Sequence, residues 1–208
     1  AQSGAGSLLL THADLYLSQP KGRLTVKNKI VLVPSIKDPI KASPGFEKKL
    51  LSEYKLDIMG LCGFGCLYCS SNTGKYLRTR REKFADITEQ QLGARVYPAE
   101  DPSLSFKWDG LVEALERQLS SKDRSWGAGK TLVFSMLTDG FSPWAVREGL
   151  TEAVLRILIE RTSFRVRVLT KNAIVGNSEW IEFFLRHRDR FVVGLSTGTL
   201  DDEWARKI

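Results

Sequence analysis

The C-terminal part of the chain alternates short apolar runs with helical patterns, and this alternation restricts the possible folds more than any other feature. Residues 131–137 (TLVFSML) form a continuous apolar run, as expected of a strand buried on both faces. Strands that alternate with helices favour an α/β fold with a parallel sheet and right-handed crossovers. The pattern predicts further strands at 164–169 and 191–196, and helices at 145–161, 178–187 and 200–208.

Upstream of this region the patterns are weaker. Residues 29–33 (KIVLV) predict a short strand, and residues 54–59 predict a strand that runs into a cysteine-rich loop. Residues 108–119 have helical spacing, whereas residues 70–107 give no clear prediction. Four strands with intervening helices are as compatible with an open sheet or an incomplete barrel as with a closed barrel.

Positive charge is concentrated at the start of the chain. Of the net charge of +7, residues 1–50 carry +5, because they hold eight Lys and Arg but only three acidic residues. We therefore divide the chain into a basic, irregular arm (1–50) and a core (51–208). The arm is either a nucleic-acid contact surface or a solvated segment without a partner, and the basic run at 78–83 has the same two interpretations.

No membrane segment is expected. No apolar run approaches the roughly 20 residues of a membrane-spanning helix, and the first ten residues make a poor signal peptide. We therefore expect a cytoplasmic protein without a membrane partner.

All three cysteines lie within eight residues, Cys62, Cys66 and Cys69, with the spacing C-x3-C-x2-C. Three thiolates in one loop can bind three irons of a [4Fe–4S] cluster, whose usual ligands are four cysteines. The fourth iron would then be open, as in metal centres that perform chemistry. Glycines within and beside the loop would let the backbone wrap closely around a cluster; they are Gly60, Gly63 and Gly65.

The alternative explanations of the cysteines are weaker. A disulfide framework needs an even count and a secreted context. A structural zinc site needs four ligands, and the two histidines, His12 and His187, are far away in sequence. Three unrelated buried cysteines would not need this spacing.

The cysteine spacing, with Tyr68 just before the last cysteine, resembles the signature of the radical S-adenosylmethionine superfamily. Further segments resemble its spore photoproduct lyase-like members. The stretch LTDGFSP (137–143) resembles their TDPYQP motif. Residues 149–151 and 155–160 resemble their next helix, residues 169–171 a "TK" strand end, and residues 195–201 a fourth strand followed by "TLD".

The resemblance implies a fold, an activity and cofactors. The fold would be a partial (β/α)6 TIM-type barrel, of which this chain covers about the first four β/α units and lacks the last strands. A [4Fe–4S] cluster on Cys62, Cys66 and Cys69 would reductively cleave S-adenosylmethionine, and the resulting radical would abstract hydrogen from an unidentified substrate, with nucleic acid as one candidate. The electron would come from a donor of flavodoxin or ferredoxin type.

The resemblance also suggests cofactor-binding residues, each with a plainer alternative. Thr138 would contact S-adenosylmethionine or cap a turn, and Asp139 would bind its amino group or form an Asx turn. Lys171 would pair with its carboxylate or be a solvated strand-end lysine. Ser196 would touch the same cofactor or be solvated, and Tyr68 would line the cluster or the adenine, or simply pack.

One departure from the family restricts the reaction. Spore photoproduct lyase has a hydrogen-donating cysteine shortly before the conserved aspartate, whereas residues 135–137 here are Ser-Met-Leu. We therefore expect a lyase-like relative, not the repair enzyme itself. Two alternatives remain open: a nucleic-acid-binding protein with a structural or redox-sensing cluster, and a degenerate family member without turnover.

Overall fold

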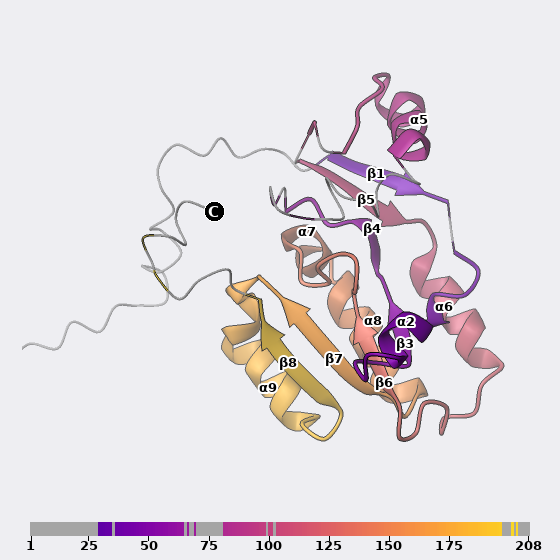
Figure 1. The fold of residues 1–208 in the computed structure, drawn as a ribbon, viewed down its shortest axis with the longest axis vertical. Helices are drawn as coiled ribbons and strands as arrows, with labels where there is room; N and C mark the ends of the chain where they lie inside the picture. Colours follow the sequence, from indigo (N-terminus) through magenta and orange to yellow (C-terminus); the bar gives the residue numbers. More distant parts are fainter. Residues whose placement is uncertain are drawn as a thin grey trace, which may run out of the picture.

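The fold has two β-sheets and a layer of helices, as seen in a computed structural model (Figure 1). The structure describes residues 29–34, 36–64, 66, 69, 81–98, 100–101, 103–196, 201 and 203. These residues confirm the predicted α/β class. The predicted helix at 200–208 and most of the expected basic arm, residues 1–28, lie outside the described residues.

The smaller sheet has three strands in the order β1-β5-β4. β1 (Lys29–Val33) pairs in parallel with β5 (Leu104–Trp108), which pairs antiparallel with β4 (Met59–Leu61). Helix α5 (Arg81–Leu92) packs on β1, where the Gln91 amide bonds both the N–H and the carbonyl of Leu32 at 2.9 and 2.6 Å. The strand predicted at 29–33 is confirmed.

The larger sheet has five strands in the order β2-β3-β6-β7-β8. Its strands β3, β6, β7 and β8 are parallel, as the sequence predicts, and only β2 is antiparallel to its neighbour. The bounds are β2 Ile40–Ala42, β3 Tyr54–Leu56, β6 Thr131–Phe134, β7 Arg165–Thr170 and β8 Phe191–Leu195.

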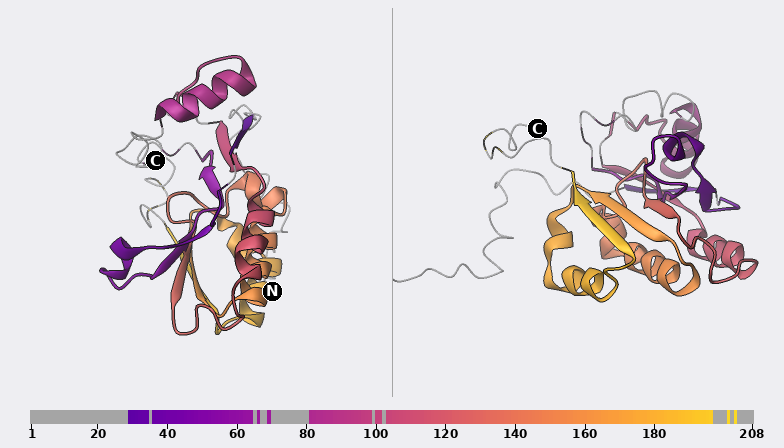
Figure 2. Two further views of the ribbon diagram at one scale, coloured as in Figure 1. Left: turned by 90° about the vertical axis from the view of Figure 1, so that its right-hand side faces the viewer. Right: turned by 60° about the horizontal axis from the view of Figure 1, so that its bottom comes forward.

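Helices cover one face of this sheet (Figure 2). Along β7 buried and exposed residues alternate, and Val166 and Val168 pack in the core while Arg167 and Leu169 face away from it. The helices are α6 (Leu111–Ser120), α7 (Pro143–Arg147), α8 (Leu150–Arg161) and α9 (Ser178–Arg186), with a short 3-10 helix η1 (Ala173–Gly176) before α9 and a single turn α2 (Pro44–Glu47) after β2.

Two predicted elements are each divided into two in the structure, because the backbone turns inside them. The single helix at 145–161 is two helices, separated by Gly149, whose φ of 70° is a left-handed conformation that ends α7. The single strand at 54–59 is also two strands, β3 and β4, which join different sheets. This switch carries the chain from the larger sheet to the smaller one.

The expected boundary at residue 50 does not separate the described residues into arm and core. Residues 29–42 were assigned to the arm, but β1 pairs with β5 and β2 pairs with β3. The sheets are open and form no closed barrel among the described residues. The structure thus shows the α/β class, and it shows no barrel within its described part.

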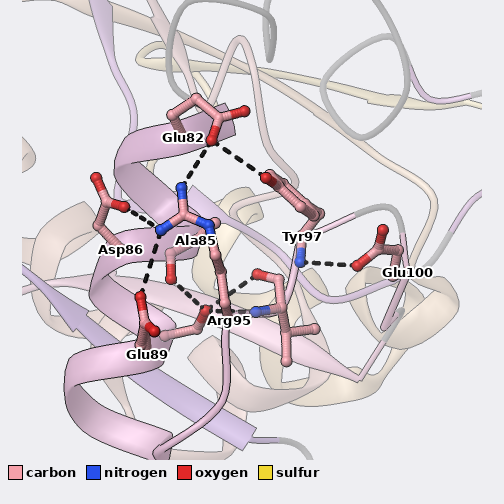
Figure 3. A network of polar contacts seen from close by, with 9 residues as sticks. Glu82, Ala85, Asp86, Glu89, Arg95, Tyr97 and Glu100 are labelled. Atoms are coloured by element: carbon pink, nitrogen blue, oxygen red, sulfur yellow. Dashed lines mark hydrogen bonds and ion pairs between the residues drawn. The ribbon is translucent and has the colours of Figure 1, made fainter.

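An exposed ionic cluster fixes the loop after α5 (Figure 3). The Arg95 guanidinium contacts the carboxylates of Glu82, Asp86 and Glu89 on that helix. The Tyr97 hydroxyl donates to Glu82 at 3.1 Å. Contacts with Asp86, Tyr97 and Glu82 raise the pKa of Arg95, so its guanidinium stays charged, and the cluster ties the loop after α5 to that helix.

Candidate functional site

A cavity of about 580 Å³ lies on the helix-free side of the larger sheet. Its walls come from the ends and the open face of β6, β7 and β8, from the turn that holds Phe46, and from the cysteine loop. In parallel α/β folds, ligands bind at the carboxyl ends of the strands. The cavity includes that edge, and so its position agrees with ligand binding.

The cysteine loop begins directly after β4. Cys62 is buried, whereas Cys66 and Cys69 are half-buried, and all three are free thiols that line the cavity. The amide of Cys69 donates to the carbonyl of Cys66 at 3.0 Å, which holds these two cysteines close to each other. Gly63 has a φ of 67°, and a Cβ there would lie 2.1 Å from the Ser105 hydroxyl, so only glycine brings the loop this close to β5.

Burial raises the pKa of the Cys62 thiol, and the nearby charges of Asp139 and Cys69 raise it further. Hydrogen bonds from the backbone of Phe64 and Asp139 act in the opposite direction. Without a metal the thiol is therefore protonated near neutral pH. A metal bound here would have to displace that proton, and the two backbone donors would then stabilise the thiolate.

Asp139 connects the loop after β6 to the end of β7. Its carboxylate accepts hydrogen bonds from the Phe141 amide at 2.9 Å, the Thr170 hydroxyl at 2.7 Å and the Lys171 amide at 2.9 Å. The first bond is the Asx turn that the sequence offered as an alternative. With three partners and only 8% exposure, this side chain positions the cavity wall.

Two further bonds join the neighbouring strands at the same edge. The Ser196 amide after β8 donates to the Thr170 carbonyl at 2.8 Å. The Leu137 amide after β6 donates to the carboxylate of Asp57, which lies between β3 and β4, at 2.7 Å. Hydrogen bonds therefore connect the ends of the strands along this edge, from β3 to β8.

Three buried hydroxyls around the cavity lack hydrogen-bond partners among the described residues. They belong to Ser52, Ser135 and Thr138. A buried hydroxyl without a partner is unfavourable by about 1–3 kcal/mol and usually indicates an absent ligand or water. Ser135 also has a φ of 58°, a strained conformation for a residue other than glycine that is typical of functional sites.

The predicted site residues converge. The cavity is lined by Cys62, Cys66, Cys69, Thr138, Asp139, Lys171 and Ser196, whereas Tyr68 lies outside the described residues. Four further residues line the cavity that no sequence pattern marked as site residues: Ser52, Ser135, Arg167 and Thr170. The alternation along β7 places Arg167 on the open face and was the one signal that could have revealed it.

The described residues contain no group of three or more His, Cys, Asp or Glu side chains arranged around a single metal ion. A cubane cluster is larger than one ion and takes one thiolate on each iron, so its ligands stand farther apart. Three free thiols that line one cavity are the kind of ligands that such a cluster takes.

Comparison with models of known protein families, with curated proteins and with solved structures yields no match to this chain. Within the described part of the chain, each helix is too short or too polar to cross a bilayer.

Proposed function

We propose that this chain is a radical S-adenosylmethionine enzyme. Cys62, Cys66 and Cys69 would bind a [4Fe–4S] cluster, and the polar residues at the ends of β6, β7 and β8 would bind S-adenosylmethionine. When bound, such a cluster supplies the electron that cleaves S-adenosylmethionine to a carbon radical, which abstracts hydrogen from the substrate.

One observation carries the proposal: the three cysteines line the same cavity as Thr138, Asp139, Lys171 and Ser196. These residues come from four separate segments of the chain and were selected from sequence motifs alone. Two unrelated sites would not need to share a cavity. The joint placement favours one centre that combines a metal and an organic cofactor.

Each strand end has a distinct role in this proposal. The Thr138 hydroxyl, which has no partner among the described residues, would donate to the cofactor. Asp139 would act as a positioning residue, because its carboxylate already holds Thr170 and the Lys171 amide. Lys171 would contribute positive charge for a carboxylate of the cofactor, and Ser196 would border the opposite side.

A partial (β/α)6 barrel is part of the same proposal. The parallel order β3-β6-β7-β8 matches the succession of strands expected in a partial (β/α)6 barrel. The open face of the sheet would then be the inner face of that barrel. Burial in such an interior would shield a reactive radical from water.

Anaerobic reconstitution with iron and sulfide tests the cluster. We expect about four irons per chain with the wild-type protein, and markedly less with Cys62→Ala, Cys66→Ala or Cys69→Ala. A wild-type chain that takes up no iron would contradict the proposal.

The absence of a fourth cysteine predicts no turnover on thymine-dimer DNA, since no thiol outside the loop is present to return hydrogen.

A further inference from the structure

Arg167 lies on the open face of the larger sheet, on strand β7. In the sheet register it lies directly between Val133 on β6 and Val192 on β8, and all three residues line the cavity. The Arg167 side chain is exposed and lines the cavity between two valines, so a ligand in the cavity can reach its guanidinium.

The described residues make few polar contacts with the Arg167 guanidinium. One Nη atom donates to the Leu51 carbonyl at 3.2 Å, and this is its one hydrogen bond to the described residues. No carboxylate of those residues lies within ion-pair distance of it. Since Arg has five N–H donors arranged in a fork, most of them are open to solvent or to a ligand in the cavity.

A second group at the same place also lacks a partner. Ser52 follows Leu51 directly, lines the cavity and is 3% exposed, yet its hydroxyl has no partner among the described residues. Among the described residues that line the cavity, Asp139 alone carries a carboxylate, and it already accepts three hydrogen bonds near the end of β7. The region around Arg167 is thus positive and rich in donors.

We propose that Arg167 and Ser52 bind an oxyanion of the substrate, a phosphate or a carboxylate. A guanidinium binds either group through two parallel hydrogen bonds, and a buried serine hydroxyl supplies a third. This inference rests on the proposed function only in assigning the oxyanion to the substrate of the cysteine centre.

The position of the site restricts the substrate further. Arg167 precedes Lys171 by four residues, which is about 13 Å along an extended strand. The substrate would therefore be an anionic molecule whose charged group binds along β7, before the strand end where the cofactor would bind.

Protection of arginine from phenylglyoxal tests the site in the full chain without any cluster. Peptide mass mapping would follow the modification of Arg167 and Arg165, with inorganic phosphate, succinate or chloride present at equal ionic strength. Arg165 is the matched control, because it is exposed on the same strand and the same face but does not line the cavity. We expect phosphate or succinate to slow modification of Arg167 about tenfold and to leave Arg165 unchanged.

The two anions distinguish the sources of the charge, since stronger protection by phosphate or by succinate indicates which group the substrate carries. Equal modification rates of Arg167 in phosphate, succinate and chloride would overturn the proposal and leave Arg167 as a tether for Leu51. Calorimetric titration of the protecting anion provides a second measurement. Arg167→Gln should weaken binding about tenfold and Ser52→Ala severalfold, while Arg165→Gln should not.

Failure of this site and failure of the proposed function are separable. Cleavage of S-adenosylmethionine without anion protection would refute only the oxyanion site. Protection without iron uptake would refute only the cysteine centre.

Discussion

The Thr170 hydroxyl donates a 2.7 Å hydrogen bond to the Asp139 carboxylate, and this bond fixes the loop after β6 against the end of β7. Thr170 is 1% exposed and its oxygen also accepts from the Asn172 amide at 3.0 Å. The pair therefore sets the distance between the two strand ends that border the cavity.

Replacing Thr170 by valine keeps the shape of the side chain but leaves a buried carboxylate oxygen with one donor fewer. We expect a loss of about 1–3 kcal/mol in the free energy of unfolding, measured by urea denaturation. Thr170→Ser retains the hydroxyl and should recover most of this loss. Equal stability of the valine variant and the wild type would show that the bond does not hold the cavity edge.

Gly63 and Gly93 offer a matched pair for the cysteine loop. Both have positive φ values, 67° and 73°, so alanine strains the backbone similarly at each. Only at Gly63 would the new Cβ clash, with the Ser105 hydroxyl at 2.1 Å, whereas nothing lies within 4 Å at Gly93. We expect Gly93→Ala to destabilise by about 1 kcal/mol and Gly63→Ala by clearly more, with reduced iron uptake. Similar losses for both variants would contradict close packing of the loop on β5.

Ser135 combines a strained backbone with an unpartnered buried hydroxyl. Glycine relieves both, so we expect Ser135→Gly to stabilise the fold by about 1 kcal/mol in thermal unfolding. Ser135→Ala keeps the strain and should gain less. Both variants should bind S-adenosylmethionine more weakly than the wild type, and tight binding by both would show that this hydroxyl serves no ligand.

Asp101 makes stability depend on acid pH. Partial burial acts to raise the pKa of its carboxyl, but hydrogen bonds from Ser103 and from the Lys29 ammonium, at 2.9 Å, outweigh that effect and lower it. A lowered folded pKa contributes stability above the unfolded value of about 3.9, and that contribution disappears as pH falls through the folded pKa. Asp101→Asn should therefore be less stable than the wild type at pH 7, and the difference should shrink below about pH 4. A pH-independent difference between the two unfolding curves would contradict this origin.

Local patterns in the sequence were sufficient for the α/β class, and they pointed to seven of the residues that line the cavity. Thr138 and Lys171 follow the parallel strands β6 and β7, and parallel strands bring their carboxyl ends to one edge without any knowledge of packing. The division at Gly149 could not be predicted, because a left-handed glycine inside an apolar pattern has no periodic signal of its own. The remaining elements depend on which strands pair with each other, and this pairing is not visible in local sequence.

The region 70–107 illustrates that limit. β5 is the central strand of the smaller sheet, but its partners β1 and β4 are distant in sequence, and no local pattern specifies them. Arg167 and Ser52 were missed for a similar reason, since one is separated from the other by more than a hundred residues and only the folded sheet unites them.

The most direct measurement is the fate of S-adenosylmethionine on the reconstituted, dithionite-reduced protein under anaerobic conditions. Chromatography would quantify 5′-deoxyadenosine for the wild type and for a variant in which Cys62, Cys66 and Cys69 are all alanine. We expect 5′-deoxyadenosine from the wild type and none above background from the variant. A wild-type chain that carries a complete cluster and leaves S-adenosylmethionine intact would contradict the central claim.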